Sequence, residues 1–287
     1  MVKKESIYAF VIPRFEDIFS SFFATEVIKG VSVTASRIKS DILIHISEKH
    51  GSEDWLNSSR FNFDYVDGIL IGDIDGDKNI LKKLVNKKIP YLIMNNYFAD
   101  LPINCITIDN YKASIEVVDY LVSLGHTQIA TITGDLLTQS GALRLNGFKD
   151  ALKKHNIKLK DSYVGVGNFL RTPARIVAEK ILSLKPRPTA IFAASDVMAM
   201  EVIDAAKSKG LDVPNDLSVV GFDDNPINIY SPVPLTTVSQ PVVEMGRLAL
   251  ETLHQISLGK IKLPVKILLP TQLIKRKSAA ALSKKGN

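Results

Sequence analysis

Short, wholly apolar runs alternate with longer amphipathic stretches from one end of the chain to the other. Ile7–Ile12 and Tyr91–Met94 are typical of strands that are buried on both faces of a sheet. Ser21–Ser36 carries its apolar residues at mixed spacings of three and four positions, which favours a helix. Such alternation predicts an α/β protein in which right-handed crossovers join parallel strands and helices cover both faces of each sheet.

The pattern restarts after the fourth strand, so the periodicity allows two doubly wound sheets of similar size. The predicted strands are Ile7–Ile12, Asp41–Ile46, Gly68–Ile71, Tyr91–Met94, Gln128–Thr133, Ser162–Gly165, Ala190–Ala193, Ser218–Phe222 and Val265–Leu268. The predicted helices are Ser21–Ser36, Asn79–Asn86, Ala113–Leu124, Gly141–His155, Thr172–Leu184, Val197–Lys209 and Val242–Leu258, with a polar helix between the second and third strands.

The size and composition are typical of a soluble globular protein with room for two cores. The chain has 287 residues, of which 46% are hydrophobic and 23% charged. It has no apolar run of the ~18 to 20 residues that span a membrane, and its start lacks a signal-peptide pattern. Cys105 is the sole cysteine, and its apolar setting predicts a small residue in a buried strand. We expect a cytoplasmic protein without an intrachain disulfide.

The net charge of +6 does not by itself indicate nucleic-acid binding. The most concentrated lysines are Lys82, Lys83, Lys87 and Lys88 in one helix and its exit, and Lys275, Lys277, Lys284 and Lys285 in the tail. Solvated helix faces and a frayed terminus explain these positions. No segment interleaves basic and aromatic residues as a single-strand binder does.

Catalytic and metal-binding motifs do not fit the chain, so we expect neither an enzyme nor a metal or cofactor. Asp73–Asp77 resembles a calcium loop, but its glycine occupies a ligand position and no glutamate closes the loop. Asp223 and Asp224 follow a strand directly, where neighbouring side chains point in opposite directions and cannot easily share one substrate. The five histidines are never at metal-ligand spacing and are predicted to be surface or capping residues: His45, His50, His126, His155 and His254.

The stretch Pro188–Pro241 carries the most information. It predicts a buried strand, a helix with Ser195 and Asp196 at its start, a second strand that delivers Asp223 to its carboxyl end, and a return strand. The order of these elements and their amino-acid sequence resemble the effector-binding core of the lac repressor family of bacterial transcription regulators. Further matching pieces run in the family's order: Val66–Ile71, Lys88–Asn95, Ile106–Asn110, Leu124–Gly134, Ser140–Leu152, Glu244–Arg247 and Leu269–Arg276.

This resemblance implies two periplasmic-binding-protein-like lobes of type I, joined by three crossings. The N-terminal lobe would hold residues 6–109 and 241–269, and the C-terminal lobe residues 110–240 and 270–280. The resemblance also implies a homodimer that binds a small-molecule effector in a cleft between the lobes. Operator DNA would be bound only through a helix-turn-helix headpiece, which no segment of this chain resembles.

The resemblance places the effector site on residues of both lobes. Arg144 matches an arginine that binds the effector, Asp223 matches an acceptor for ligand hydroxyls, and Phe169 matches an aromatic residue that stacks on the ligand. A polyhydroxylated ligand needs such bidentate polar groups and an aromatic face. The remaining candidates are Phe22, Phe23, Asn95, Ser140, Ser195 and Gln240. On composition alone, Arg144 is more often a surface residue and the phenylalanines more often core.

Two departures from the family pattern leave the ligand's identity open. Asn95 stands where many sugar-responsive members have aspartate, and Ser195 where many have asparagine. Arg144 and Asp223 balance in charge, which favours a neutral sugar over a phosphorylated one, unless Arg14 points inward. The rival functions are a solute-binding protein of a sugar transporter, which shares the fold, and an enzyme on the same scaffold.

Overall fold

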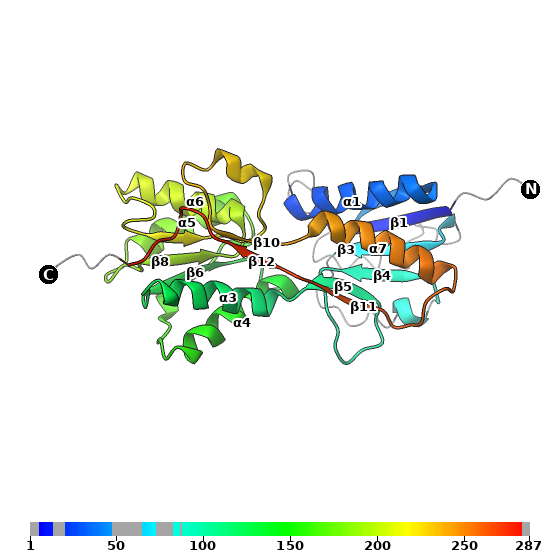
Figure 1. Cartoon of the computed structure of the whole chain (residues 1–287), viewed down its shortest axis with the longest axis horizontal. Coiled ribbons are helices and arrows are strands. Elements are labelled where there is room, and N and C mark those ends of the chain that lie inside the picture. Colours follow the sequence, from blue (N-terminus) through cyan, green and yellow to red (C-terminus); the bar gives the residue numbers. More distant parts are fainter. Residues whose placement is uncertain (1–5, 14–20, 48–64, 73–82, 87, 283–287) are drawn as a thin grey trace, which may run out of the picture. The chain divides into compact units, whose positions relative to one another are not determined.

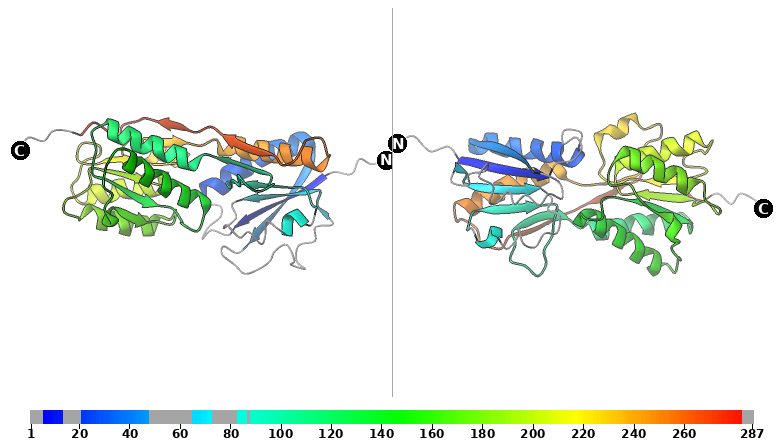
Figure 2. Two further views of the ribbon diagram at one scale, coloured as in Figure 1. Left: turned by 90° about the horizontal axis from the view of Figure 1, so that it is seen from below. Right: turned by 180° about the vertical axis from the view of Figure 1, so that it is seen from behind.

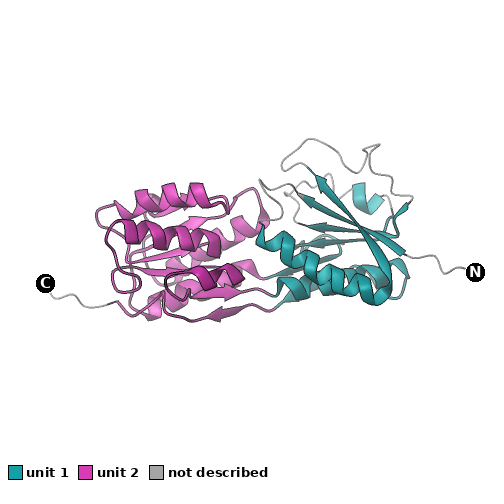
Figure 3. Cartoon of the chain, turned by 90° about the horizontal axis from the view of Figure 1, so that it is seen from above, with its two compact units in different colours: residues 1–108, 241–269 teal, residues 109–240, 270–287 magenta. Residues whose placement is uncertain are grey.

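The computed structural model describes residues 6–13, 21–47, 65–72, 83–86 and 88–282. The predicted polar helix, the Asp73–Asp77 loop, His50, Arg14 and part of the predicted helix Asn79–Asn86 lie outside these residues. The chain divides into two compact units, coloured separately in Figure 3. Unit 1 comprises residues 1–108 and 241–269 and unit 2 residues 109–240 and 270–287, so the chain passes between them three times.

Unit 1 is built on a parallel sheet of six strands in the spatial order β11-β5-β4-β3-β1-β2 (Figure 1). The strands are β1 (Ser6–Pro13), β2 (Ser40–Ser47), β3 (Gly68–Gly72), β4 (Tyr91–Met94), β5 (Cys105–Ile108) and β11 (Lys266–Leu269). Every residue of β3, β4 and β5 is buried, as their apolar runs predict. Cys105 is fully buried, in agreement with the sequence prediction.

Helices α1 (Phe22–Ile38) and α7 (Val242–Ser257) pack against each other in unit 1, and α7 also packs on β3 and β4. Glycine permits the close helix contact, since a Cβ atom on Gly30 would collide with the backbone oxygen of Val243. The hydroxyl of Ser21 caps α1 by accepting from the backbone N–H of Ala24. This cap marks the start of α1, where Phe22 and Phe23 lie.

Unit 2 contains a parallel sheet of four strands in the order β7-β6-β8-β9 and an antiparallel pair, β10-β12. The strands are β6 (Ile129–Thr133), β7 (Val164–Val166), β8 (Ala190–Ala193), β9 (Ser218–Val220), β10 (Thr237–Ser239) and β12 (Gln272–Ile274). The long helices are α3 (Asn110–Ser123), α4 (Gln139–Lys154), α5 (Arg171–Leu182) and α6 (Asp196–Ser208). Two short 3₁₀ helices are η3 (Asp161–Tyr163) and η4 (Pro226–Tyr230).

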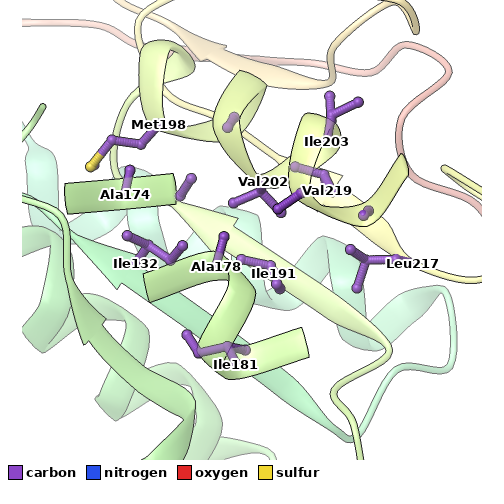
Figure 4. Close-up of a cluster of buried hydrophobic side chains, with 14 of the residues drawn as sticks. Ile132, Ala174, Ala178, Ile181, Ile191, Met198, Val202, Ile203, Leu217 and Val219 are labelled. Atoms are coloured by element: carbon purple, nitrogen blue, oxygen red, sulfur yellow. The ribbon is translucent and has the colours of Figure 1, made fainter. Parts of the chain in front are cut away.

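Helices α3 and α4 pack on one face of the four-stranded sheet of unit 2, and α5 and α6 pack on the other (Figures 1 and 2). Figure 4 shows the core beneath α5 and α6, where strand residues such as Ile132 and Ile191 meet Ala178 and Val202 from the helices. The predicted α/β architecture with parallel sheets is confirmed in both units.

Several predicted ends of helices and strands are wrong. Ser162 lies in η3, and the following strand begins only at Val164. Strand β9 stops at Val220, because the N–H of Gly221 donates to Thr236 O instead of continuing the ladder with β8. Helix α3 begins at Asn110, since the carboxylate of Asp109 accepts from the N–H of Lys112 at 2.9 Å and caps it earlier than predicted.

The surface or capping role predicted for His126 is also wrong. Its side chain is 2% exposed and lies just after the turn that ends α3. Its Nδ1 lies 3.0 Å from the hydroxyl of Thr189, and its Nε2 lies 3.0 Å from that of Ser218 and 3.1 Å from Ala280 O. Burial lowers the pKa of His126, opposed by the bond to Ala280. Among the described residues, no helix is both long and apolar enough to cross a membrane.

Candidate functional site

Arg144 points into the interior of unit 2 from the middle of α4. Its side chain is buried, its Nε donates to Asn110 Oδ1 at 2.8 Å, and its Nη1 donates to Ala194 O at 2.6 Å. The guanidinium carbon lies 3.5 Å from the ring centroid of Phe222, which places a cation on an aromatic face. Helix α3, the residue after β8 and the segment after β9 therefore hold the guanidinium in one orientation.

Asp223 lies beside this guanidinium and is also buried. Its Oδ1 is 3.7 Å from Arg144 Nη1 and accepts from Gln240 Nε2 at 2.6 Å. Burial raises the pKa of Asp223 to about 8, against the lowering effect of Arg144, while the neighbouring Asp196 raises it further. Its neighbour Asp224 points elsewhere and accepts from Arg276 Nη2 at 2.7 Å, so the two adjacent carboxylates have different partners.

Three of the predicted site residues have backbone conformations that side chains other than glycine rarely adopt. The φ angle is 122° at Asp223, 62° at Phe169 and 65° at Asn95. Such conformations cost of order 1–3 kcal/mol each and concentrate at functional sites. The same conformation occurs outside the predicted site, at Lys39, Lys88 and Asn156, so it does not by itself mark a binding segment.

The ring of Phe169 packs over Gly134, where any Cβ atom would collide with it. The guanidinium carbon of Arg144 is 5.7 Å from the centroid of the same ring. The loop after β7 thus brings an aromatic face to the cluster that Arg144 and Asp223 form. The ring is only partly buried, so part of its surface remains accessible for stacking.

Two serines of the predicted site support the ends of helices. Ser195 is the N-cap of α6 and accepts from the N–H of Met198 at 3.4 Å, and it directly follows Ala194, whose carbonyl binds Arg144. Ser140, near the start of α4, lies with its hydroxyl 3.2 Å from that of Thr138. Both serines are buried.

Sequence reasoning missed two buried residues that hold the cluster. Asn110 accepts from Arg144, and Asp196, which is fully buried, orders the segment that follows Asp223. The carboxylate of Asp196 accepts from Asn225 N and Asn228 Nδ2 at 2.7 Å and from Thr237 Oγ1 at 2.5 Å. Burial raises the pKa of Asp196 to about 6. In the sequence, Asp196 had only the pattern of a helix cap.

The structure thus brings four of the predicted residues together in unit 2: Arg144, Asp223, Gln240 and Phe169. Phe22, Phe23 and Asn95 belong to unit 1, the first two at the start of α1 and the third directly after β4. Asn95 is buried, and its N–H donates to Ile106 O at 2.9 Å.

The cluster is suited to hold a small molecule that carries several hydroxyl groups. Gln240 Oε1 is buried without a hydrogen-bond partner, and an unsatisfied acceptor of this kind costs about 1–3 kcal/mol. A hydroxyl that donates to it, with another that donates to Asp223, would remove this penalty. In the described part of the chain, no group of three His, Cys, Asp or Glu side chains is arranged to hold a metal ion.

Comparisons with known proteins agree on one family. The model of the periplasmic binding protein-like domain matches residues 118–279. The transcriptional regulator DegA of Bacillus subtilis is 31% identical over 284 residues, which cover 98% of this chain and 83% of DegA. The transcriptional repressor CytR of Escherichia coli is 32% identical over 274 residues, which cover 93% of this chain and 78% of CytR.

Solved structures give the same result. The lac repressor dimer bound to operator and an anti-inducer is similar with a TM-score of 0.85 and 26% identity, over 98% of this chain and 96% of that one. The complex of the transcriptional regulator CelR with cellobiose is similar with a TM-score of 0.87 and 26% identity, over 95% of this chain and 84% of that one.

Proposed function

The chain belongs to the lac repressor family of transcriptional regulators and corresponds to their effector-binding core, and from this premise we propose that it binds a neutral sugar as its effector. The observation that carries the proposal is the buried cluster of Arg144, Asp223 and Gln240, which presents an acceptor without a partner beside a fixed guanidinium. Phe169 supplies the aromatic face that the apolar side of a sugar ring needs.

Charge balance favours a neutral ligand. Arg144 carries the only positive charge in the cluster, and Asp223 lies 3.7 Å from it. A ligand hydroxyl that donates to Asp223 stabilises the ionised carboxylate, and the ionised pair then has no net charge. A phosphorylated sugar would need a further cation. The relative CelR is described in complex with cellobiose, a neutral disaccharide.

The other parts of the proposal come from the family. Phe22, Phe23 and Asn95 in unit 1, and Ser140 and Ser195 in unit 2, would add contacts to the same effector. The core would pair as a homodimer in the cytoplasm, and effector binding would change how a helix-turn-helix headpiece binds operator DNA. The relatives described above are transcriptional regulators, which supports regulation over solute transport or catalysis.

Calorimetry on the purified chain tests this proposal. A panel of neutral mono- and disaccharides that includes cellobiose is titrated beside glucose 6-phosphate. We expect saturable binding of a neutral member. Asp223→Asn and Arg144→Ala should each weaken it by about 2–5 kcal/mol, the effect of removing a buried charged partner.

The control variant is Arg175→Ala, which removes an arginine of unit 2 that pairs with Glu179 on α5. Circular dichroism is recorded for every variant, because Arg144 also bonds to Asn110 and Ala194. Full affinity in Asp223→Asn, or binding of the phosphorylated sugar alone, would contradict the proposal.

A further inference from the structure

A surface hollow with a basic rim lies in unit 2 at the carboxyl end of α4. It has a volume of about 490 Å³ and is lined by Lys149, Lys153, Asn156, Ile157, Lys158 and Leu159. Helix α4 contributes the first two lysines, and the segment after the helix contributes the other four residues. None of these residues belongs to the cluster around Arg144.

The three lysines of the hollow form no ion pair with any carboxylate of the described residues. Two neighbouring lysines differ in this respect. Lys154 pairs with Asp119 at 2.9 Å, and Lys160 lies 5.0 Å from the ring centroid of Tyr163. The three lysines therefore have no direct ion pair with a described carboxylate, and the nearby Asp150 directs one oxygen to the hydroxyl of Tyr111 instead.

The floor of the hollow is apolar and fixed. Between Asn156 and Lys160 exposure alternates, so that Ile157 and Leu159 are partly buried while their neighbours are exposed. Leu159 packs against the core of unit 2, and the N–H of Ile157 donates to Leu152 O at 2.9 Å. Two partly buried aliphatic side chains thus line the same hollow as three lysines.

Helix stabilisation accounts for only part of this charge. Lys153 and Lys154 lie in the last turn of α4, where cations interact favourably with the helix dipole. Lys149 lies one turn earlier and Lys158 lies beyond the helix. Lys149 and Lys153 are also one turn apart on the same face, and like charges at that spacing destabilise a helix. An anionic partner would remove this repulsion.

We propose that the hollow binds an acidic segment of a partner protein that inserts an apolar side chain between Ile157 and Leu159. Carboxylates on either side of that side chain would reach Lys149, Lys153 and Lys158. The apolar floor favours this partner over a nucleic-acid backbone, which offers phosphates but no aliphatic group. The site is separate from the effector cluster and does not depend on its ligand.

Fluorescence polarisation tests the proposal with a short labelled peptide of aspartate and glutamate that contains two leucines. The variant Lys149→Glu/Lys153→Glu should bind it at least about tenfold more weakly than the unmodified chain, and added salt should weaken binding to the unmodified chain. The matched control is Lys180→Glu/Lys207→Glu, which makes the same change in net charge. Its lysines lie in the last turns of α5 and α6, as Lys153 does in α4, so it should bind like the unmodified chain.

Two further probes separate the alternatives. A peptide with serine in place of both leucines should bind more weakly, because it leaves the floor uncovered. A duplex oligonucleotide of arbitrary sequence should show no loss of binding specific to the hollow variant. Equal binding of both peptides, equal weakening by the two double variants, or no peptide binding at low salt would overturn the proposal. The same holds if the oligonucleotide alone depends on Lys149 and Lys153.

Discussion

Asp223 has a buried carboxyl group and a backbone φ of 122°, and both features are unfavourable in an isolated fold. Its partners reduce the first cost only in part. Gln240 and the backbone of Asp196 each donate a hydrogen bond to the carboxyl group, while Arg144 Nη1 remains at 3.7 Å and directs its own bond to Ala194. The residue is thus held ready for a further donor, which agrees with the proposed role in effector binding.

The charge state of Asp223 makes a prediction about stability. Its pKa is about 8 in the folded protein and about 3.9 when unfolded, so the folded state holds the proton more tightly. Raising the pH across this interval therefore destabilises the fold, by up to about 1.4 kcal/mol per pH unit. Denaturant unfolding between about pH 6.5 and 8 should show a decline in the unfolding free energy that Asp223→Asn abolishes.

That pH window isolates Asp223 from two other buried groups. Asp196, with a pKa of about 6, gives its decline at lower pH. The lowered pKa of His126 reduces stability only as the pH falls below its ordinary value of about 6.5. Asp224→Asn, which removes the partner of Arg276, should keep the slope of the unmodified chain. Equal slopes in all three proteins would show that Asp223 is ionised in the fold.

The family resemblance nominated Arg144 and Asp223, but the sequence did not reveal the residues that hold them. Asn110 lies 34 positions from Arg144, and Thr237 lies 41 positions from Asp196. Such residues come into contact only in the folded protein, so a local sequence pattern does not predict that they form a hydrogen bond. The buried Gln240 Oε1, which has no hydrogen-bond partner, was equally unpredictable, because the burial of a single atom depends on the whole fold.

At the scale of elements, buried strands were the most predictable. Tyr91–Met94 and Ala190–Ala193 agree with the structure at both ends. Ends set by other segments were not predictable. Strand β9 ends at Val220 because the next residue pairs with the segment around Thr236, and the hydrophobic pattern of the sequence does not predict this pairing.

The segment after β12 is an element that the pattern did not predict at all. Ser278 is fully buried, and its hydroxyl donates to Val219 O at 2.6 Å and accepts from Thr236 N at 2.8 Å. Two residues later, Ala280 O lies 3.1 Å from Nε2 of His126. The C-terminal segment is thus hydrogen-bonded to β9 and to His126 after the end of α3.

These hydrogen bonds predict that changes at His126 and in the C-terminal segment have non-additive effects on the free energy of unfolding. His126→Ala leaves buried partners unsatisfied and should cost about 1–3 kcal/mol of unfolding free energy. Deleting residues 278–287 should cost a comparable amount. The combined variant should lose less than the sum, because both changes remove the same contacts. Chemical denaturation measures all three, and strict additivity would show that the two features stabilise unit 2 independently.

For the whole molecule, the proposed dimer can be tested on the chain alone. Ile229 and Tyr230 are 78% and 76% exposed at the end of η4, which Asp196 holds through Asn225 and Asn228. Apolar groups held rigidly in water are suited to pairing. Light scattering should give about twice the chain mass of 31.6 kDa, and Tyr230→Asp should give the monomer. A monomeric unmodified chain at micromolar concentration would contradict the dimer.

Effector-driven movement of the two units is the remaining prediction at this scale. The proposed contacts belong to both units, with Arg144 and Asp223 in unit 2 and Asn95 in unit 1. A ligand that touches both binds best to the state in which both sets of contacts are made, and this difference in affinity shifts the equilibrium. Dihedral changes would concentrate at the three crossings, near residues 108–109, 240–241 and 269–270.

Distances between spin labels on the two units measure this movement directly. Ser32→Cys on α1 and Lys180→Cys on α5 place labels on exposed positions, while the native Cys105 is buried and stays unlabelled. The sugar selected by calorimetry should shift the distance distribution, and Asp223→Asn should prevent the shift at the same concentration. A coupling of about 1–3 kcal/mol would change operator affinity roughly 5- to 150-fold once a headpiece is attached. An unchanged distance at saturating sugar would refute the movement and would mean that ligand binding does not move the two units.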